Sequence, residues 1–584
     1  MTLFGTNRQF DLTRLPFTVA GAFLGIYQKL SDGRLYLSIY RSENVVHERP
    51  DLLRLVPVDA VGDELPSIYE CDEAKLTVNT KQGSVEFTYD GPQIMRVRTN
   101  GVTLRVENEP KMHEGAYSRG SGKEIELAFN FMGKLLFNSI SGKMEHNIFW
   151  NYAEVRPNPY KIDITGECAI HEYISNGTAN DSYPPFDEAY KNTLAKFEEF
   201  RSAYPEFPVQ YRDMARRAMW NVWHNQLGPR GTLTSSPIYM HKLFMDRAFG
   251  WHHGFHAMAM SRDVKRAIDV LLAMFDYANH LGVFPDNLSD QHQETWISTK
   301  PPIFGFATCY ILEHFDTSEL TSDDYRRLYD KLSKYTAYWF AHHDHARTGI
   351  PSYYHIDESG YDESTLFNGG LPIQAPDLQA YIVTLCEACS LLAEKLGLAD
   401  DAERWDTERR RILAFLVEDL WDGEQFLARL PACGGKTYRC GSVAQLQPVM
   451  LGHRLPRTII KKLARRLLDE REYLTDYGIA SEHLQSPEFL AGSFTRGPVV
   501  APTQALIILG LFDGGEQDAA RSLAARYLNA LNTEGLALGI HPFRAEPVTY
   551  MPTRREYSGQ SVSFPFSAWV ASVYLLLSQL FPAP

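Results

Sequence analysis

The chain has 584 residues, of which 44% are hydrophobic and 12% aromatic, and its formal net charge is -14 at pH 7. This length exceeds what one hydrophobic core usually organises, and the apolar content is enough for two, so two folded domains are predicted. The negative charge and the scattered basic residues argue against a nucleic-acid partner, because proteins of that class gather Lys and Arg on one face.

Short runs of alternating or β-branched residues fill the chain up to about residue 185, and Asp-Gly, Asn-Gly and Ser-Gly pairs separate them. Examples are the runs at 34–40, 74–78, 84–89, 94–98 and 125–129. This pattern predicts an antiparallel β-sandwich over residues 1–185. Seven cysteines form no disulfide scaffold, and the N-terminus lacks a basic segment followed by an apolar core. We therefore expect a cytoplasmic protein.

Beyond residue 185 the apolar residues recur at spacings of three and four, as at Leu378, Tyr381, Ile382 and Leu385. This spacing is typical of amphipathic helices. Other segments are almost entirely apolar, namely 302–312, 499–511 and 566–580. Two classes of helix predict two concentric layers with the apolar set inside, which is an (α/α)6 barrel over residues 186–584.

Three features that resemble special sites have simpler interpretations. Cys386 and Cys389 form a C-x-x-C inside a helical pattern without a second pair at zinc spacing, so core thiols are predicted. His252 and His256 stand one helical turn apart but lack the glutamate of a zinc protease, so no metal is expected. The apolar run 566–581 is shorter than the roughly 20 residues that cross a bilayer, so it predicts a buried helix and no membrane partner.

The segment 351–367 is unusually rich in both acids and aromatic rings and reads PSYYHIDESGYDESTLF. Its carboxylates are Asp357, Glu358, Asp362 and Glu363. A site that cleaves a glycosidic bond needs rings for the apolar sugar face and one carboxyl group that stays protonated. The segment therefore favours half of a glycosidase active site over an acidic turn between two helices.

Five segments in order carry a family resemblance. They read MHKLFMDRAFGWHHGFHAMAM, WISTKPPIFGF, DHARTGIPSYYHIDESGYDESTLF, GIASEHLQSPEFLAGSFTRGPVVAP and RREYSGQSVSFPFSAWVASVYLLL. Together they resemble the catalytic domain of glycoside hydrolase family 63 and its amylo-α-1,6-glucosidase-like and mannosylglycerate-hydrolase-like relatives, over about residues 210–584. The resemblance implies an (α/α)6 barrel that hydrolyses an α-glycosidic bond with inversion, in the manner of an α-glucosidase. It implies a small glycoside or oligosaccharide as substrate and no cofactor.

The resemblance also assigns roles to individual residues. The Glu-Ser-Gly-x-Asp turn places the general acid on Asp362, and the carboxylate before the last inner helix places the general base on Glu556. Arg554 and Arg555 would keep Glu556 ionised, although the three residues also fit a surface ion-pair cluster. The substrate-binding residues predicted in this way are Trp251, His252, Trp296, Lys300, Tyr361, Glu482 and Arg496.

Two positions depart from the family pattern. His252 follows Trp251 where an acid is common, and Lys300 precedes Pro-Pro where glutamine is common. Because an acid at the first position binds sugar hydroxyls, these changes predict altered substrate choice. If Lys300 and Arg496 are both unpaired they predict an acidic sugar or aglycone. If Lys300 pairs with Glu482 or another acid, they predict an uncharged substrate.

Two other functions remain open from the sequence. A sugar epimerase or isomerase on such a barrel would use histidines such as His252, His256 and His355, and loss of Glu556 would only weaken it. A non-catalytic carbohydrate-binding protein would keep the rings but has no need of Asp362. The sequence leaves open the sugar, the linkage, and whether the chain is a monomer or a homo-oligomer.

Overall fold

The computed structural model describes residues 10–29, 31–41, 51–119, 122–130, 132–243, 245–291, 296–548 and 566–582. These residues form two compact units. The first contains the described residues within Met1–Arg201, Trp220–Arg247 and Ser289–Gln293, and the second contains the others. The predicted boundary at residue 185 falls just before α1 (Phe186–Arg201), and as a domain division it stays a prediction.

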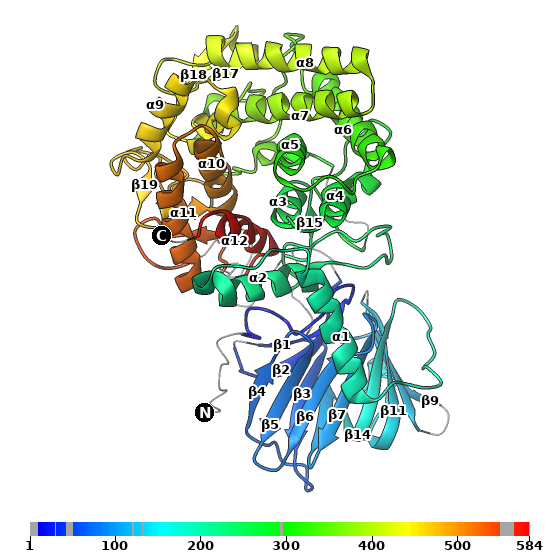
Figure 1. The fold of residues 1–584 in the computed structure, drawn as a ribbon. Helices are drawn as coiled ribbons and strands as arrows, with labels where there is room; N and C mark the ends of the chain where they lie inside the picture. Colours follow the sequence, from blue (N-terminus) through cyan, green and yellow to red (C-terminus); the bar gives the residue numbers. More distant parts are fainter. Residues whose placement is uncertain are drawn as a thin grey trace. The chain divides into compact units, whose positions relative to one another are not determined.

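The first unit is built from antiparallel strands. In the described part of the chain these are β1 (Leu24–Gln28), β2 (Leu35–Ile39), β3 (Leu53–Val58), β4 (Ser67–Cys71), β5 (Lys75–Thr80), β6 (Ser84–Tyr89), β7 (Ile94–Asn100), β8 (Thr103–Asn108), β9 (Gly115–Arg119), β10 (Glu124–Phe129), β11 (Gly133–His146), β12 (Trp150–Asn151), β13 (Arg156–Pro157) and β14 (Tyr160–Tyr173). They are drawn in blue to cyan in Figure 1.

The strands β1 to β11 and β14 form one continuous hydrogen-bonded sheet, and the long strands β11 and β14 join its two halves. The first half of β14 pairs with β8, which continues to β3, β2 and β1, and its second half pairs with β7, which continues to β6, β5 and β4. Along its other edge β14 pairs with β11, where the register shifts between Ser139 and Ser141. Gly142 and Gly166 face each other at this point with φ of 80° and 88°. A side chain on either glycine would meet the backbone of the opposite strand, so only glycine allows both strands to continue from one half of the sheet to the other.

Alternation of burial along the strands explains why the two halves of the sheet face each other. In β5 the apolar residues Leu76 and Val78 are buried, and in β8 the apolar residues Leu104 and Val106 are buried, while the residues between them are partly exposed. Side chains of period two place all of these apolar residues on one face of each half. The predicted antiparallel β-sandwich is confirmed.

The second unit contains two classes of helix. Helices buried along most of their length are α3 (His252–Ala259), α5 (Phe304–His314), α7 (Pro376–Lys395), the 3₁₀ segment η8 (Gln447–Arg454), α10 (Ala501–Asp513) and α12 (Ala568–Leu580). Helices with one exposed face are α4 (Val264–Leu272), α6 (Ser322–His342), α8 (Ala399–Ala414), α9 (Arg457–Leu467) and α11 (Gln517–Glu534). α2 (Arg212–Asn225) begins in this unit and ends in the first.

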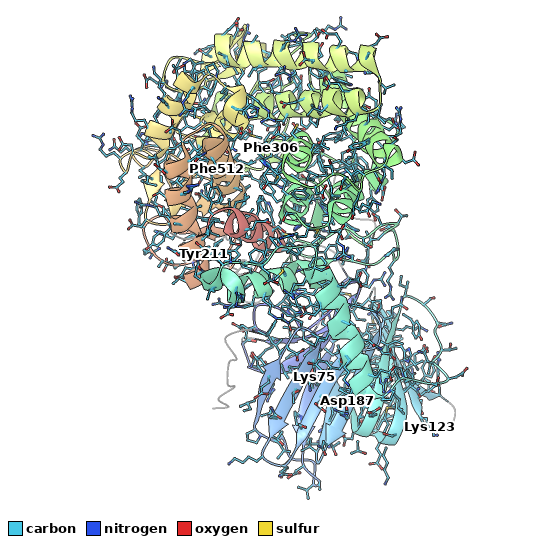
Figure 2. All side chains as sticks on the ribbon, in the orientation of Figure 1. Lys75, Lys123, Asp187, Tyr211, Phe306 and Phe512 are labelled. Atoms are coloured by element: carbon cyan, nitrogen blue, oxygen red, sulfur yellow. The ribbon has the colours of Figure 1, made fainter. Side chains whose placement is uncertain are left out.

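The buried helices close a ring. α3 contacts α5, α5 contacts α7, α7 contacts η8, η8 contacts α10, α10 contacts α12, and α12 contacts α3 again. The exposed helices pack outside them, for example α8 on α7 and α11 on α10, as Figure 1 shows in green to red. Figure 2 labels one residue on each of two inner helices, Phe306 on α5 and Phe512 on α10. The predicted (α/α)6 barrel, with the apolar segments 302–312, 499–511 and 566–580 inside, is confirmed.

The barrel geometry decides where a site can form. Each outer helix returns the chain between two inner helices, so the inner helices run in one direction and their N-terminal ends share one end of the barrel. The loops there also carry the short strand pairs β15 (Ala248–Phe249) with β16 (Asn287–Leu288), and β21 (Val499–Val500) with β22 (Gly539–Ile540). Periodicity does not predict strands this short.

The special features of the sequence have ordinary places in this fold. Cys386 and Cys389 are buried and lie on α7. The last apolar run forms α12, whose residues from Ala568 to Ser578 are all buried. No helix among the described residues has the length and apolar character that spanning a membrane requires.

Candidate active site

The acid-rich segment folds into a tight turn, here called the acid turn and defined as residues 355–365. It begins at η3 (Ile356–Ser359), where the His355 ring accepts a hydrogen bond from the Asp357 N–H and the Glu358 carboxylate accepts one from the His355 N–H. Gly360 ends this 3₁₀ turn in the left-handed region with φ of 70°. The chain then passes through Tyr361 and Asp362 to η4 (Thr365–Gly369).

The carboxylates of the acid turn have different surroundings. Glu358 is buried, accepts hydrogen bonds from the N–H of Tyr354 and His355, and contacts His343 Nε2 at 3.0 Å. Glu363 accepts a hydrogen bond from the Phe494 N–H. No hydrogen bond from the described residues reaches Oδ1 of Asp362, although this atom is buried. Glu358 and Glu363 therefore hold the turn together, whereas Asp362 has a carboxyl oxygen that none of the described residues binds.

Residues distant in sequence surround the acid turn. The Tyr361 hydroxyl donates to Gln447 Oε1 at 2.9 Å and lies 2.8 Å from Thr503 Oγ1. The Thr365 hydroxyl donates to Glu482 at 2.8 Å, and Arg496 Nε donates to the Glu363 carbonyl at 3.0 Å. All of these partners lie just before or at the start of inner helices. The acid turn with Asp362 is therefore surrounded by residues from the N-terminal end of the barrel.

Gly360 packs directly against a predicted site residue. A Cβ at this position would lie 2.5 Å from the indole of Trp251, and its φ of 70° disfavours side chains. We expect Gly360→Ala to destabilise the fold by about 1–3 kcal/mol and to lower kcat/KM by about a hundredfold through displacement of Asp362. Gly397→Ala is the matched control, because Gly397 has the same φ of 70° and no atom within 4 Å. Chemical unfolding and kinetics of both variants measure the difference, and equal effects of the two substitutions would contradict this packing role.

Lys300 stands beside the acid in a network of charges. Its Nζ lies 3.1 Å from Asp286 Oδ1 and 4.0 Å from Asp362 Oδ1, and it donates to the Asp357 carbonyl at 3.2 Å. Burial lowers the pKa of Lys300, but the carboxylates of Asp286, Asp362 and Asp357 outweigh burial and raise it above its usual value. Lys300 is therefore a charged, paired ammonium.

The position of Asp362 alters its acidity. Burial raises the pKa of Asp362 to about 6, with Lys300 acting in the lowering direction and Asp357, Asp286 and Glu363 in the raising direction. Burial also raises the pKa of Asp377, in the first turn of α7, to about 7. Asp377 is fully buried and accepts a hydrogen bond from the Tyr353 hydroxyl at 3.0 Å, whereas the Asp362 side chain is 34% exposed. A general acid must reach its substrate, so Asp362 is the better placed of the two.

His252 and His256 on α3 are buried, whereas the side chain of His355 in the acid turn is 37% exposed. His252 stacks on Trp569 with ring centroids 4.2 Å apart, and Trp569 also contacts Trp251 at 4.5 Å. Burial holds the pKa of His252 and His256 well below the usual value. His256 Nδ1 lies 2.6 Å from the Ser572 hydroxyl. Uncharged imidazoles of this kind are suited to packing and hydrogen bonding rather than to carrying a proton at neutral pH.

The remaining predicted residues have mixed outcomes. Glu482 is buried, and burial raises its pKa. Arg496 lies 3.6 Å from Glu488. Trp296 is 47% exposed, and its part in the site stays a prediction. Glu556 lies outside the described residues. The structure thus brings Trp251, Lys300, Tyr361, Glu482 and Arg496 to the turn that bears Asp362, and their roles as substrate contacts stay predictions.

Sequence reasoning missed three polar residues at this end of the barrel. Asp286 pairs with Lys300, Asp377 binds Tyr353, and Gln447 binds Tyr361. Asp377 follows Pro376 at the start of a helix, where an acid is expected for capping reasons alone. Asp286 lies in the run Phe-Pro-Asp-Asn, which by itself indicates only a proline-containing turn with an acid beside it. Asp286 and Asp377 are recognised as parts of the site only through contacts with residues distant in the sequence, which a single sequence does not show.

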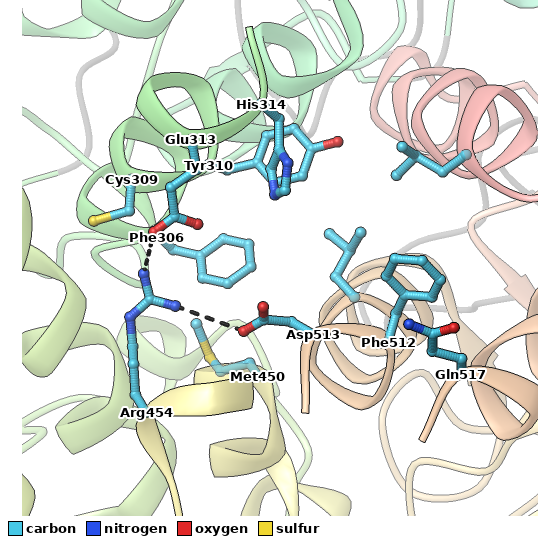
Figure 3. A pocket seen from close by; sticks show the side chains of 12 residues that line it. Phe306, Cys309, Tyr310, Glu313, His314, Met450, Arg454, Phe512, Asp513 and Gln517 are labelled. Atoms are coloured by element: carbon cyan, nitrogen blue, oxygen red, sulfur yellow. Dashed lines mark hydrogen bonds and ion pairs between the residues drawn. The ribbon is translucent and has the colours of Figure 1, made fainter. Parts of the chain in front are cut away.

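A separate pocket of about 320 Å³ lies at the C-terminal ends of the inner helices α5, η8, α10 and α12, away from the acid turn. Figure 3 shows its rings, among them Phe306, Tyr310 and Phe512. The buried Arg454 in its wall is bound to Glu313 at 2.8 Å and to Glu387 at 2.6 Å. The carboxylates among its lining residues, Glu313 and Asp513, are both paired with Arg454, and Asp513 also pairs with His453 at 2.7 Å, so neither is the free carboxyl group that glycoside cleavage needs.

Comparison with solved structures supports the fold. The glycoside hydrolase family 63 mannosylglycerate hydrolase from Thermus thermophilus, in complex with glucose, is 20% identical with a TM-score of 0.51, and the match covers 62% of this chain and 99% of that one. The same hydrolase in complex with Tris and D-glycerate gives 18% identity and a TM-score of 0.52 over the same shares, 62% and 99%. A bacterial glucoamylase complexed with acarbose is 11% identical with a TM-score of 0.58 over 98% of this chain and 96% of that one.

The family comparison is more specific. No curated protein matches the sequence. The family model described as the mannosylglycerate hydrolase MGH1-like glycoside hydrolase domain matches residues 246–558, more than half of the chain. That range contains the acid turn, Lys300 and Glu556, and it confirms the resemblance drawn from the five segments. The chain therefore belongs to the mannosylglycerate hydrolase MGH1-like family of glycoside hydrolases, and it is a glycosidase.

Proposed function

We propose that this glycosidase cleaves the α-glycosidic bond of a small glycoside or oligosaccharide with inversion of configuration. Asp362 is the general acid and Glu556 is the general base. The observation that carries the proposal is the carboxyl group of Asp362, which has a buried oxygen without a hydrogen-bond partner among the described residues and a pKa raised to about 6. A carboxyl group with a pKa raised in this way is protonated to a higher pH than an ordinary aspartate, so it can give a proton to a substrate oxygen.

The proposed reaction is a single displacement. Asp362 gives its proton to the glycosidic oxygen while the bond from that oxygen to the anomeric carbon breaks. Glu556 takes a proton from a water molecule that attacks the anomeric carbon from the opposite face. The products are the free aglycone and a sugar of inverted configuration, and a separation of roughly 6.5–9.5 Å between the two carboxyl groups is expected because the water lies between them.

A screen of α-glucosides and α-mannosides with purified protein tests the proposed function. The screen should detect hydrolysis of at least one small α-glycoside, and Asp362→Asn should remove it. Hydrolysis that persists in Asp362→Asn on substrates with poor leaving groups would reject the assignment. Activity on β-glycosides alone would reject the proposed linkage.

The charges around the acid turn favour an uncharged aglycone. The condition for an acidic aglycone was that Lys300 and Arg496 are both unpaired, but Lys300 is paired with Asp286. With Asp362 protonated as the acid, the carboxylates of Asp286 and Asp357 still outnumber the Lys300 ammonium that lies beside them among the described residues. A substrate carboxylate brought to this turn would meet net negative charge.

We therefore expect glycosides of glycerol to be hydrolysed several-fold faster, in kcat/KM, than the glycosides of glycerate that differ from them by one carboxylate. Competition between the two substrates, followed by chromatography of the products, measures the ratio directly. A preference for the glycerate compound that disappears in Arg496→Gln would show that Arg496 recognises a substrate anion, contrary to this expectation.

A further inference from the structure

The Lys300 ammonium is held from one side by residues that have no predicted part in the chemistry. Asp286 Oδ1 forms an ion pair with Lys300 Nζ at 3.1 Å, and Asp286 Oδ2 accepts a hydrogen bond from Asn287 at 2.8 Å. Asn287 belongs to β16, which pairs with β15 directly before Trp251. Asp286 is therefore a fixed buried carboxylate, only 4% exposed, whose place is set by the strand pair at the start of α3.

The other side of the ammonium faces the proposed acid. An ammonium has three N–H groups, and two of those of Lys300 are directed to Asp286 and to the Asp357 carbonyl. Asp362 Oδ1 lies 4.0 Å away, which is too far for a hydrogen bond but close enough for a strong Coulomb interaction in a buried site. Lys300 thus acts on Asp362 through its charge and not as a hydrogen-bond donor.

We propose that Asp286 and Lys300 are positioning residues that set the pH range of catalysis: Asp286 anchors the ammonium of Lys300 at a fixed distance from the carboxyl group of Asp362. This inference rests on the proposed role of Asp362 as general acid. Without Asp286 the ammonium can move onto Asp362 and keep it ionised, so that no proton is available for the leaving group. Without Lys300 the carboxylates of Asp286, Asp357 and Glu363 act on Asp362 unopposed.

Substitution of Lys300 and substitution of Asp286 should therefore shift the pH dependence of catalysis in opposite directions. The general acid must be protonated, so kcat/KM falls as the pH rises through the pKa of Asp362. Lys300→Gln removes a positive charge, which raises this pKa and moves the alkaline limb up by about one to two pH units. Asp286→Asn removes a negative charge and frees the ammonium, which lowers the pKa and moves the limb down by about one pH unit. Lys300→Arg keeps the charge and should leave the limb near its wild-type position.

The experiment combines two titrations of the full-length protein. Carboxyl ¹³C resonances of aspartate, with Asp362 assigned by its loss in Asp362→Asn, give the pKa of Asp362 in the wild type, Lys300→Gln and Asp286→Asn. The pH dependence of kcat/KM gives the alkaline limb in the same three proteins. Opposite shifts in both measurements support the inference, whereas shifts in the same direction or no shift overturn it.

The two readouts separate this inference from the proposed function. If the pKa of Asp362 moves in opposite directions but the alkaline limb does not follow, the charge relationship is right and Asp362 is not the acid. Should Lys300→Gln fail to fold, as judged by thermal unfolding, Asp286→Asn decides alone, because Asn keeps the size of the side chain but removes the charge that anchors Lys300. A rise of the limb in Asp286→Asn would then overturn the inference.

Discussion

Asp362→Asn is expected to lose about a hundred- to ten-thousand-fold in kcat on glycosides with poor leaving groups, because the leaving oxygen no longer receives a proton. The fold should survive, since asparagine has nearly the same shape and the substituted carboxyl oxygen Oδ1 has no hydrogen-bond partner among the described residues. Substrate binding should also survive. Steady-state kinetics with circular dichroism as the control for folding measure these effects.

Leaving-group dependence distinguishes a lost acid from a distorted site. Glycosyl fluorides and aryl glycosides with acidic phenols need little protonation, so Asp362→Asn should hydrolyse them much closer to the wild-type rate. Asp377→Asn is an informative comparison, because Asp377 also has a raised pKa but is fully buried against Tyr353. If Asp377→Asn shows the rescue pattern and Asp362→Asn loses activity equally on every substrate, the general acid is Asp377.

The second large effect is expected for Glu556→Gln. Without a general base the attacking water stays unactivated whatever the leaving group, so activity should fall on every substrate, including glycosyl fluorides. Glu546→Gln serves as the control, because Glu546 pairs with Arg544 at 2.8 Å and is about half exposed. A Glu556→Gln variant with near wild-type rates would favour the surface ion-pair interpretation of Arg554, Arg555 and Glu556.

The architecture was predictable because each layer imposes its own period on the sequence. Alternation in runs such as 84–89 predicts a half-buried strand, now β6, and the fully apolar segment 499–511 predicts an inner helix, now α10. The continuation of β11 and β14 through both halves of the sheet was not predictable. It depends on pairing between Gly142 and Gly166, and a single sequence records glycines but not their partners.

Some features of the site follow from neighbouring residues in the sequence, whereas others depend on contacts between residues far apart in the sequence. The turn that bears Asp362 was predictable from its neighbours in sequence, among them Gly360 and Tyr361, while the role of Asp362 as general acid follows from the family resemblance and stays a prediction. The partner of Lys300 was not predictable: Glu482 was one candidate, and the structure instead places Asp286 there, while Glu482 accepts from Thr365. Which carboxylate neutralises a lysine depends on which loops meet at the end of the barrel, and local patterns carry no information on that.

The configuration of the first-formed sugar tests the central claim most directly. Wild-type enzyme and an α-glycoside are mixed in the magnet, and the anomeric proton signals are followed before mutarotation equilibrates them. Single displacement by water, with Asp362 as acid and Glu556 as base, predicts that the β-anomer appears first. First appearance of the α-anomer would mean retention through a covalent intermediate and would contradict the mechanism proposed for this glycosidase.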